Sequence, residues 1–324
     1  MSTYYTSKYS GEQIDEAVKK IMDGEMTGDY ADRQLSNLDT PQGALANLGA
    51  GVRPSLVDNG IFVGPNLPVN QRGDTSWSTS GYHLDRWFFE QAAACSIADD
   101  GLHIGKEQTI TQAVDADTKD FFLGKTITVS ALLSDGSFAS ATGVVALDGN
   151  GIFCHPKSGF DYGTFFFSSG SYQISRMFNH TGQEVTLVAC KTEFGSTQTL
   201  AYQDDEGAWQ LLPQPESDYA TQLLKCQKYL FDCGNGNASY PAMINGTSGI
   251  ATIQTPVQMA KTPVLVKKSS GYGVIYVNGS SIAVTNATVD ICAGNFVTIS
   301  FQIAQSVVSN CVWRECTFWL DTGM

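Results

Sequence analysis

The chain of 324 residues carries 19 Lys and Arg against 32 Asp and Glu, which gives a formal net charge of −13. This charge repels phosphate groups, so nucleic acid is excluded as an expected partner. Hydrophobic residues make up 42% of the chain and aromatic residues 11%, which indicates an ordered protein. No apolar run approaches the ~20 residues of a membrane-spanning helix, so membrane insertion is not expected.

The first 54 residues predict two short helices. Ser10 caps the first and Gly24 ends it, while Thr40 caps the second and Gly49 ends it. Helices this short are marginal alone, so their apolar side chains need partners. These apolar side chains belong to Ile14, Val18, Ile21, Leu35, Leu38, Leu45 and Leu48. We therefore expect residues 1–54 to form a neck in which copies of the chain associate.

Residues 55–231 predict a first β domain. Ile127, Val129 and Ala131 alternate with polar residues, as half-buried strands do, and turn signals lie at residues 134–137 and 148–151. No alternation of strands with long helices appears. The pattern therefore favours an antiparallel β-sandwich.

A short helix is predicted over residues 218–229, and the Gly- and Asn-rich residues 234–237 follow it as a break. Residues 232–324 then predict a second antiparallel β-sandwich. Its signals are apolar residues alternating with polar ones over residues 297–303 and a tight turn at Asn278 and Gly279. The expected fold class is mainly β, with short N-terminal helices before two β domains.

Four stretches carry a resemblance to a known family. The sequence PVNQRG at residues 68–73, followed by GYHLDRW at residues 81–87, resembles the opening of jelly-roll domains in tailed-phage tail fibres, which are similar to carbohydrate-binding modules. LGKTITVS at residues 123–130 and LLKCQKY at residues 223–229 resemble later parts of such fibres. The leucine-rich residues 35–49 resemble a short unit common in them. The resemblance covers about half of the chain.

This resemblance implies a jelly-roll fold, a homotrimer, and a tail or baseplate protein that the N-terminus docks on. It also implies a host cell-surface glycan as partner and a location in the virion, at the tail tip or fibre. The first residues show no apolar signal core, which agrees with synthesis and assembly in the host cytoplasm. The net charge disfavours docking on a strongly anionic surface without a bridging cation.

The sequence shows no sign of an enzyme. It lacks a GxSxG elbow, a P-loop and an HExxH motif. A depolymerase needs two carboxylates across a cleft, and of the candidates all but the first lie in turn-like contexts: Asp85, Asp99, Asp100, Asp115, Asp117, Asp120, Asp204, Asp205 and Glu206. The acidic residues 115–120 lack the glycine and distal glutamate of a calcium loop, so an acidic turn is expected there. None of the eight cysteines has zinc-site spacing, and free thiols are expected from cytosolic assembly. We expect no metal, no cofactor and no catalytic residue.

Glycan binding needs an aromatic face and a few polar partners. The candidate rings in loop-like contexts are Trp77, Tyr162 and Trp209 in the first β domain and Tyr240, Tyr272 and Trp313 in the second. Packing in the core is the alternative for each ring. Because residues 232–324 are farthest from the neck along the chain, residues 272–278 and 311–319 are the preferred contact regions. Trp77 or Trp209 would serve a lateral site in the first domain.

The expected function is a tail fibre or receptor-binding protein that attaches a phage tail to a host glycan. Three alternatives stay open. They are a structural baseplate or tail-tip component without receptor contact, a free lectin module, and a glycan depolymerase.

Overall fold

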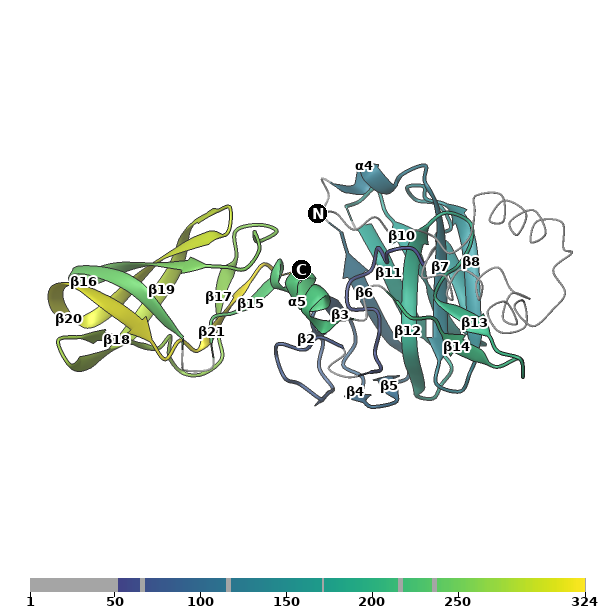
Figure 1. Ribbon diagram of the computed structural model, residues 1–324, viewed down its shortest axis with the longest axis horizontal. Helices are drawn as coiled ribbons and strands as arrows, with labels where there is room; N and C mark the ends of the chain where they lie inside the picture. The colour runs from purple at the N-terminus through teal and green to yellow at the C-terminus, as the bar shows by residue number, and fades with distance from the viewer. Residues whose placement is uncertain are drawn as a thin grey trace, which may run out of the picture.

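The computed structural model describes residues 52–64, 68–114, 118–170, 172–214, 218–234 and 238–323 (Figure 1). The chain is mainly β, with several antiparallel sheets and two short helices in this described part. The predicted neck, with its seven apolar candidates from Ile14 to Leu48, lies outside the described residues. None of the described helices is long and apolar enough to cross a bilayer.

The first β region contains two six-stranded antiparallel sheets. Sheet I has the strand order β1 (Ser76–Trp77), β4 (Cys95–Ala98), β5 (Gly101–Ile104), β12 (Val185–Phe194), β7 (Thr126–Leu133) and β8 (Phe138–Val144). Sheet II has the order β2 (Gly81–Leu84), β3 (Trp87–Phe89), β6 (Gln108–Ala113), β11 (Tyr172–Asn179), β10 (Phe160–Phe166) and β9 (Ile152–Lys157). Both sheets contribute side chains to one hydrophobic core.

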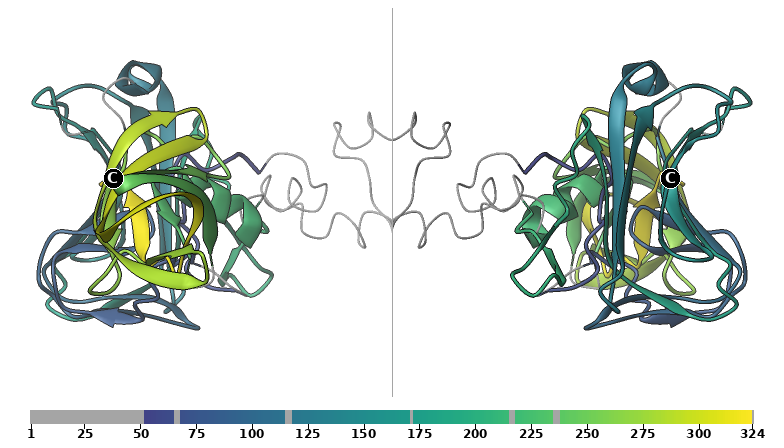
Figure 2. Two further views of the ribbon diagram at one scale, coloured as in Figure 1. Left: turned by 90° about the vertical axis from the view of Figure 1, so that its left-hand side faces the viewer. Right: turned by 90° about the vertical axis from the view of Figure 1, so that its right-hand side faces the viewer.

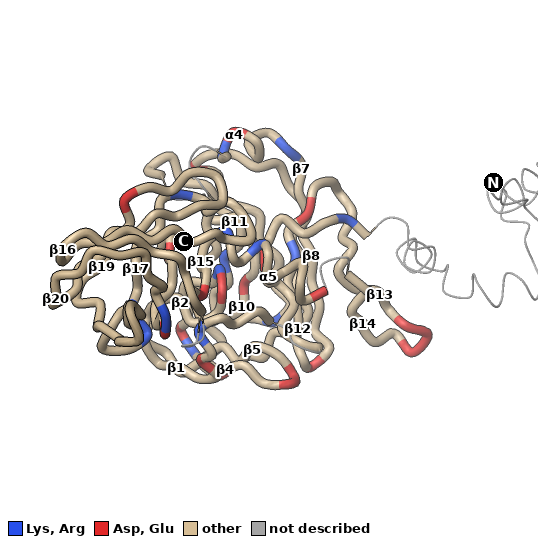
Figure 3. The backbone as a smooth tube through the Cα atoms, turned by 60° about the vertical axis from the view of Figure 1, so that its left-hand side comes forward, with Lys and Arg blue, Asp and Glu red and all other residues tan. Residues whose placement is uncertain are grey.

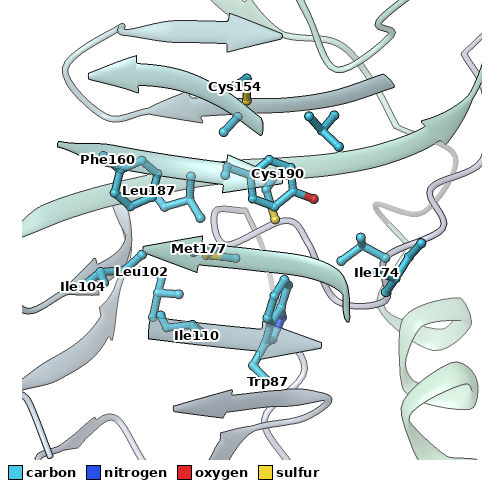
Figure 4. Close-up of a cluster of buried hydrophobic side chains, with 14 of the residues drawn as sticks. Trp87, Leu102, Ile104, Ile110, Cys154, Phe160, Ile174, Met177, Leu187 and Cys190 are labelled. Carbon is cyan, nitrogen blue, oxygen red and sulfur yellow. The ribbon is translucent and has the colours of Figure 1, made fainter. Parts of the chain in front are cut away.

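Figure 4 shows this core, in which Leu187 of sheet I and Met177 of sheet II lie fully buried. The Tyr162 hydroxyl lies 2.9 Å from Thr192 Oγ1 and so links the two sheets. Trp87 is completely buried, and its Nε1 donates to the Asn59 carbonyl at 2.8 Å.

The outer face of sheet I is covered by the segment that follows β12. Its hairpin, β13 (Ala201–Gln203) and β14 (Trp209–Leu211), forms a small second cluster in which Leu200 and Ala201 pack on Leu132 and Ala189. The alternation of Ile127, Val129 and Ala131 correctly predicts inward residues. Thr128 and Ser130 are buried as well, because the covering segment removes them from solvent. On the outer face of sheet II, Phe88, Arg176 and Phe178 are partly exposed.

Two helices punctuate this region: α4 (Lys119–Phe122) and α5 (Tyr219–Gln227). The predicted helix at residues 218–229 is confirmed as α5, and Asp218 caps it by accepting from the Thr221 amide. Its buried residues are Gln222 and Cys226, whereas Tyr219 is exposed. Gln222 is inward because its Oε1 accepts from the Asn59 amide at 2.8 Å.

The C-terminal region has its own core, with Trp313, Ile299 and Phe301 among its buried residues. One sheet contains β15 (Leu230–Asp232), β21 (Phe318–Asp321) and β17 (Val264–Lys267); the other contains β16 (Ser239–Gln254), β20 (Phe296–Arg314), β18 (Val274–Val277) and β19 (Ser280–Ala293). The left-hand view of Figure 2, which looks onto this region, shows its strands strongly curved. Because β15 pairs with β21, residues 230 and 231 belong to this region, although the sequence placed them in the first domain.

The predicted tight turn joins β18 to β19. Asn278 and Gly279 have φ angles of 49° and 80°, and Val277 pairs with Ser280. Two consecutive positive φ angles define the two-residue turn that matches strand twist, and Asn-Gly is the pair that adopts it at least cost. The prediction is confirmed.

All eight cysteines are free thiols, seven of them buried and Cys292 half-buried. Burial raises the pKa of Cys154 to about 12. A thiol with so high a pKa stays protonated and unreactive near neutral pH.

The two β regions meet at a polar junction beside α5 (Figure 1). Arg72 Nη2 lies 2.9 Å from Asp321 Oδ2, and Gln71 Nε2 donates to the Leu230 carbonyl at 2.8 Å. Arg86 lies 3.6 Å from the Tyr229 ring centroid, close enough for a cation–π contact. These contacts tie residues 71–86 of the first region to the C-terminal strands and to Tyr229, which precedes them.

Asp85 gives this junction a pH dependence. Burial raises the pKa of its carboxyl from 3.8 to about 6, although Gln71 and Arg72 oppose the shift. Between these pH values the folded chain keeps a proton that the unfolded chain has released. The free energy of unfolding therefore falls by about 3 kcal/mol as pH rises from about 4 to about 6, and this contribution stays lost at higher pH.

We expect Asp85→Asn to remove this component of the pH dependence. Urea unfolding between pH 4 and 7.5 gives the free energy of unfolding of the wild type and of the variant. The difference between the two pH profiles measures the contribution of Asp85. Two parallel curves would contradict the role given to Asp85.

Candidate functional site

Three of the six predicted glycan-binding rings are core residues. Tyr162 and Trp313 have no exposed surface, and Trp77 is only 8% exposed because it stacks on His83 and packs against Phe89. None of these rings offers a free face to a sugar. Large aromatic side chains bury so much apolar surface that core packing outweighs their loop-like sequence context.

The other three rings are partly exposed. Trp209 packs on Phe138 in the hairpin that covers sheet I, with ring centroids 4.1 Å apart. In the C-terminal region, the Tyr240 hydroxyl donates to the Cys233 carbonyl at 3.0 Å, and Lys267 Nζ lies 4.3 Å from the Tyr272 ring centroid. None of these three rings lines one of the main hollows in the described part of the chain.

The preferred contact regions are also largely turned inward. Ile275 and Val277 in residues 272–278 are buried, as are Cys311 and Trp313 in residues 311–319. Tyr276 is the exposed ring there, with the Arg314 guanidinium carbon 4.8 Å from its centroid.

A site that the sequence did not reveal lies on the outer face of sheet II. Residues that oppose each other directly on neighbouring strands point to the same face of a sheet. The strand registers place six such residues in one transverse row. In order across the sheet they are Tyr82, Phe88, Thr111, Arg176, Gly163 and Phe153. Three aromatic rings and one guanidinium thus share the open face.

Beside this row is a hollow of about 370 Å³, which we call the sheet II hollow. It is lined by Asn150, Gly151, Phe153, His155, Asp161, Arg176 and Phe178. Asp161 and Phe178 oppose each other on β10 and β11, so both point outward with Arg176. The phenylalanine rings are half-buried, which leaves part of each exposed.

Asp161 lies between two histidines. Its Oδ1 is 2.6 Å from His155 Nδ1, and its Oδ2 is 3.2 Å from His180 Nε2. These contacts hold the carboxylate in one orientation, from which it accepts hydrogen bonds at the edge of the hollow. Arg176 Nη1 donates to Gln173 Oε1 at 3.2 Å, which leaves further donors of its guanidinium for a ligand.

Glycine shapes the hollow. A Cβ atom at Gly163 would lie 2.1 Å from the Ile152 carbonyl oxygen and 2.5 Å from a Phe153 ring carbon. The absence of a side chain therefore lets the Phe153 ring lie over the strand next to Arg176. Next along β10, Phe166 points inward, while Phe165 and Phe167 are partly exposed with ring centroids 3.9 Å apart.

The arrangement suits a neutral or weakly charged polyhydroxyl ligand. Exposed ring faces contact apolar C–H surfaces, while the guanidinium, the carboxylate and the Asn150 amide donate and accept hydrogen bonds. Of the described residues that line the hollow, only Asp161 carries a carboxylate. Glycoside hydrolysis commonly uses a second carboxylate across the scissile bond, which the described lining of this hollow does not include.

No group of three or more His, Cys, Asp or Glu side chains in the described part of the chain is arranged so that it could hold a metal ion. The acidic residues 115–117 lie outside that part. No family model, no curated protein and no solved structure matches the chain.

Proposed function

We propose that the chain is a tail fibre or receptor-binding protein of a tailed phage that attaches the tail to a host surface glycan. In this proposal the first β region is a jelly-roll-like β-sandwich, and its sheet II hollow binds the glycan. The row of aromatic rings with Arg176 on an open sheet face supports this most, because it combines stacking surfaces with directed hydrogen-bond donors.

The proposal includes a homotrimer joined through residues 10–50, which dock on a tail or baseplate protein. A shallow sugar site with a Kd near 1 mM supplies only about −4 kcal/mol. Three copies that engage one surface raise the avidity by orders of magnitude without any new contact. The proposal assigns the chain a place in the virion and no catalytic step.

A specific observation also favours the structural alternative. The C-terminal region exposes aliphatic side chains, among them Val308 and Met243, and these suit a protein surface better than a sugar. A baseplate or tail-tip component without receptor contact is therefore the second candidate function.

The test uses the full-length protein on an array of bacterial surface oligosaccharides. We expect Phe153→Ala and Arg176→Ala each to weaken binding at least tenfold, which is the effect of losing about 1.4 kcal/mol of contact energy. Lys157→Ala is the matched control, because Lys157 is an exposed residue of β9 that does not line the hollow. Its binding should equal that of the wild type.

Two outcomes would contradict the proposal. If both hollow variants bind as the wild type does while Trp209→Ala or Tyr276→Ala loses binding, the receptor site lies elsewhere. If the wild-type protein neither binds any glycan on the array nor blocks phage adsorption to host cells, the structural alternative is favoured.

A further inference from the structure

The C-terminal region contains a second and larger hollow, of about 840 Å³, formed mainly by β16 and β20. β16 bends at Gly246, whose φ is +72°: Gly246 pairs with Val307, while Ser248 pairs with Gln302. Residues 303–306 of β20 thus stand opposite Thr247 alone. Beyond the bend, a Cβ atom on Gly249 would lie 2.8 Å from the Met243 carbonyl oxygen, so the two halves of β16 fold toward each other.

Three large aliphatic side chains of this hollow are open to solvent. Val308 is 78% exposed, Met243 64% and Ile250 47%, and all three line the hollow. Single exposed apolar residues are common on protein surfaces, but a group gathered in one concavity marks a contact site.

The hollow is also uncharged. Its other lining residues contribute amides and hydroxyls, from Asn245, Ser248, Asn286, Thr288, Ser300, Gln302, Ser309 and Asn310. Residues 232–324 contain four Lys and Arg and four Asp and Glu, so their net charge is 4 − 4 = 0, and the whole −13 lies in residues 1–231. Figure 3 shows β16, β19 and β20 as largely free of charged residues.

One edge of β16 borders this hollow without a partner. The strand has 16 residues and pairs with β20; among the described residues no strand pairs with its other edge. Proteins protect exposed edge strands with charges, prolines or bulges. β16 contains no charged residue, and Pro241 and the bend at Gly246 are its only such devices. So long an uncharged edge needs a cover.

We infer that a second copy of this chain covers the hollow and the free edge of β16. The same surface presents a concavity, protruding aliphatic side chains, and amides that both donate and accept, so it is able to complement itself. Residues 1–231 are strongly acidic, so these parts of two copies repel each other. Residues 232–324 have no net charge, so their association meets no such repulsion. A strongly charged partner is disfavoured, because the lining of the hollow contains no residue of opposite charge to pair with it. This interface is independent of the predicted neck and of the sheet II hollow.

The test uses the full-length chain carrying Leu38→Ser and Leu45→Ser, which remove the predicted neck contacts. Light scattering over a concentration series reports the mass, and hydrogen exchange reports the protection of the β16 amides. We expect this chain still to associate, with β16 amides that become more protected as concentration rises. Val308→Asp, at a position exposed in the single chain, should raise the Kd of association at least tenfold and abolish that rise in protection.

Val264→Asp is the matched control. Val264 is 60% exposed, lies on β17 and does not line the hollow, so its substitution should leave the mass and the exchange unchanged. A thermal melt of each variant at low concentration verifies that the single chain is folded, and Val308→Ser provides a milder second variant. The inference is overturned if the neck-substituted chain is monomeric at concentrations of about 100 μM and the exchange of its β16 amides does not change with concentration. It is also overturned if Val264→Asp weakens association as much as Val308→Asp does.

Discussion

Replacing Lys191 by Met is expected to lower the free energy of unfolding by about 3–5 kcal/mol. Lys191 and Glu193 are both buried on the outer face of sheet I, under the segment that follows β12. Lys191 Nζ donates to Thr199 Oγ1 at 2.9 Å, and Thr199 in turn donates to both Glu193 oxygens at 2.6 Å. Removing Lys191 leaves the Glu193 carboxylate buried with Arg53 as a weaker source of opposite charge, and the cost of that poorly compensated charge dominates the loss.

Lys157→Met is the control for this prediction. Lys157 Nζ lies 2.9 Å from Asp135 Oδ2, but both side chains are nearly half exposed, so water screens the pair. Its loss should cost less than about 1 kcal/mol. Urea unfolding of the two variants measures the difference, and equal costs would contradict the distinction between the buried and the exposed pair.

The Lys191→Met effect should also depend on pH. Burial raises the pKa of Glu193, and Lys191 opposes that shift. Without Lys191 the pKa rises further, so the carboxyl takes up a proton in the folded variant at a higher pH. The neutral acid carries no isolated charge, so the stability lost by the variant should be smaller at pH 5 than at pH 8.

Local sequence patterns were sufficient for much of the fold. The positive φ angles that Asn278 and Gly279 tolerate fix a two-residue turn, and the alternation over residues 297–303 fixes which side of β20 faces the core. Asp218 fixes the start of α5 by capping its first turn. Each of these depends on neighbours a few residues away, which is why a single sequence is enough to predict them.

Features that depend on distant segments were not predictable. The cover over sheet I buries Thr128, Ser130, Lys191 and Glu193, positions that alternation alone assigns to solvent. The sheet II hollow depends on register, because a shift of one residue turns Phe178 and Arg176 inward. Asp161 and His180 are brought together by pairing between β10 and β11, which no local motif marks.

The ring candidates failed for a related reason. Glycine and serine around Trp77 indicate a loop, but they say nothing about what packs on its ring, and the structure places His83 and Phe89 there. In β9, β10 and β11, the residues that indicate the sheet II hollow are those that alternate with the inward ones and point outward. They gain meaning only when the inward residues, such as Cys154, Tyr162 and Met177, are known.

Asn59 ties together the backbone of Val69 and Asp85, which are distant from it in the chain. We expect Asn59→Ala to lower the free energy of unfolding by about 4 kcal/mol or more. Its side chain donates to the Val69 and Asp85 carbonyls and accepts from the Val69 amide, at 2.7–3.0 Å, and it is completely enclosed. Alanine leaves three buried backbone groups unpaired, each at about 1–3 kcal/mol. It also forces a side chain without local hydrogen bonds to keep a φ of 56°, at about 1–2 kcal/mol.

Asn59→Gly separates the two causes. Glycine loses the same hydrogen bonds but adopts the positive φ without strain, so its cost should be smaller by about 1 kcal/mol. Asn70→Ala is the control, because Asn70 makes similar bonds to Asp74 and Gly73 in an exposed turn, where water replaces them. Urea unfolding gives the three costs, and exchange of the Val69 amide locates the loss. If Asn59→Ala lowers the free energy of unfolding no more than Asn70→Ala does, the segment from Asn59 to Asp85 is held by the burial of Trp87 and not by Asn59.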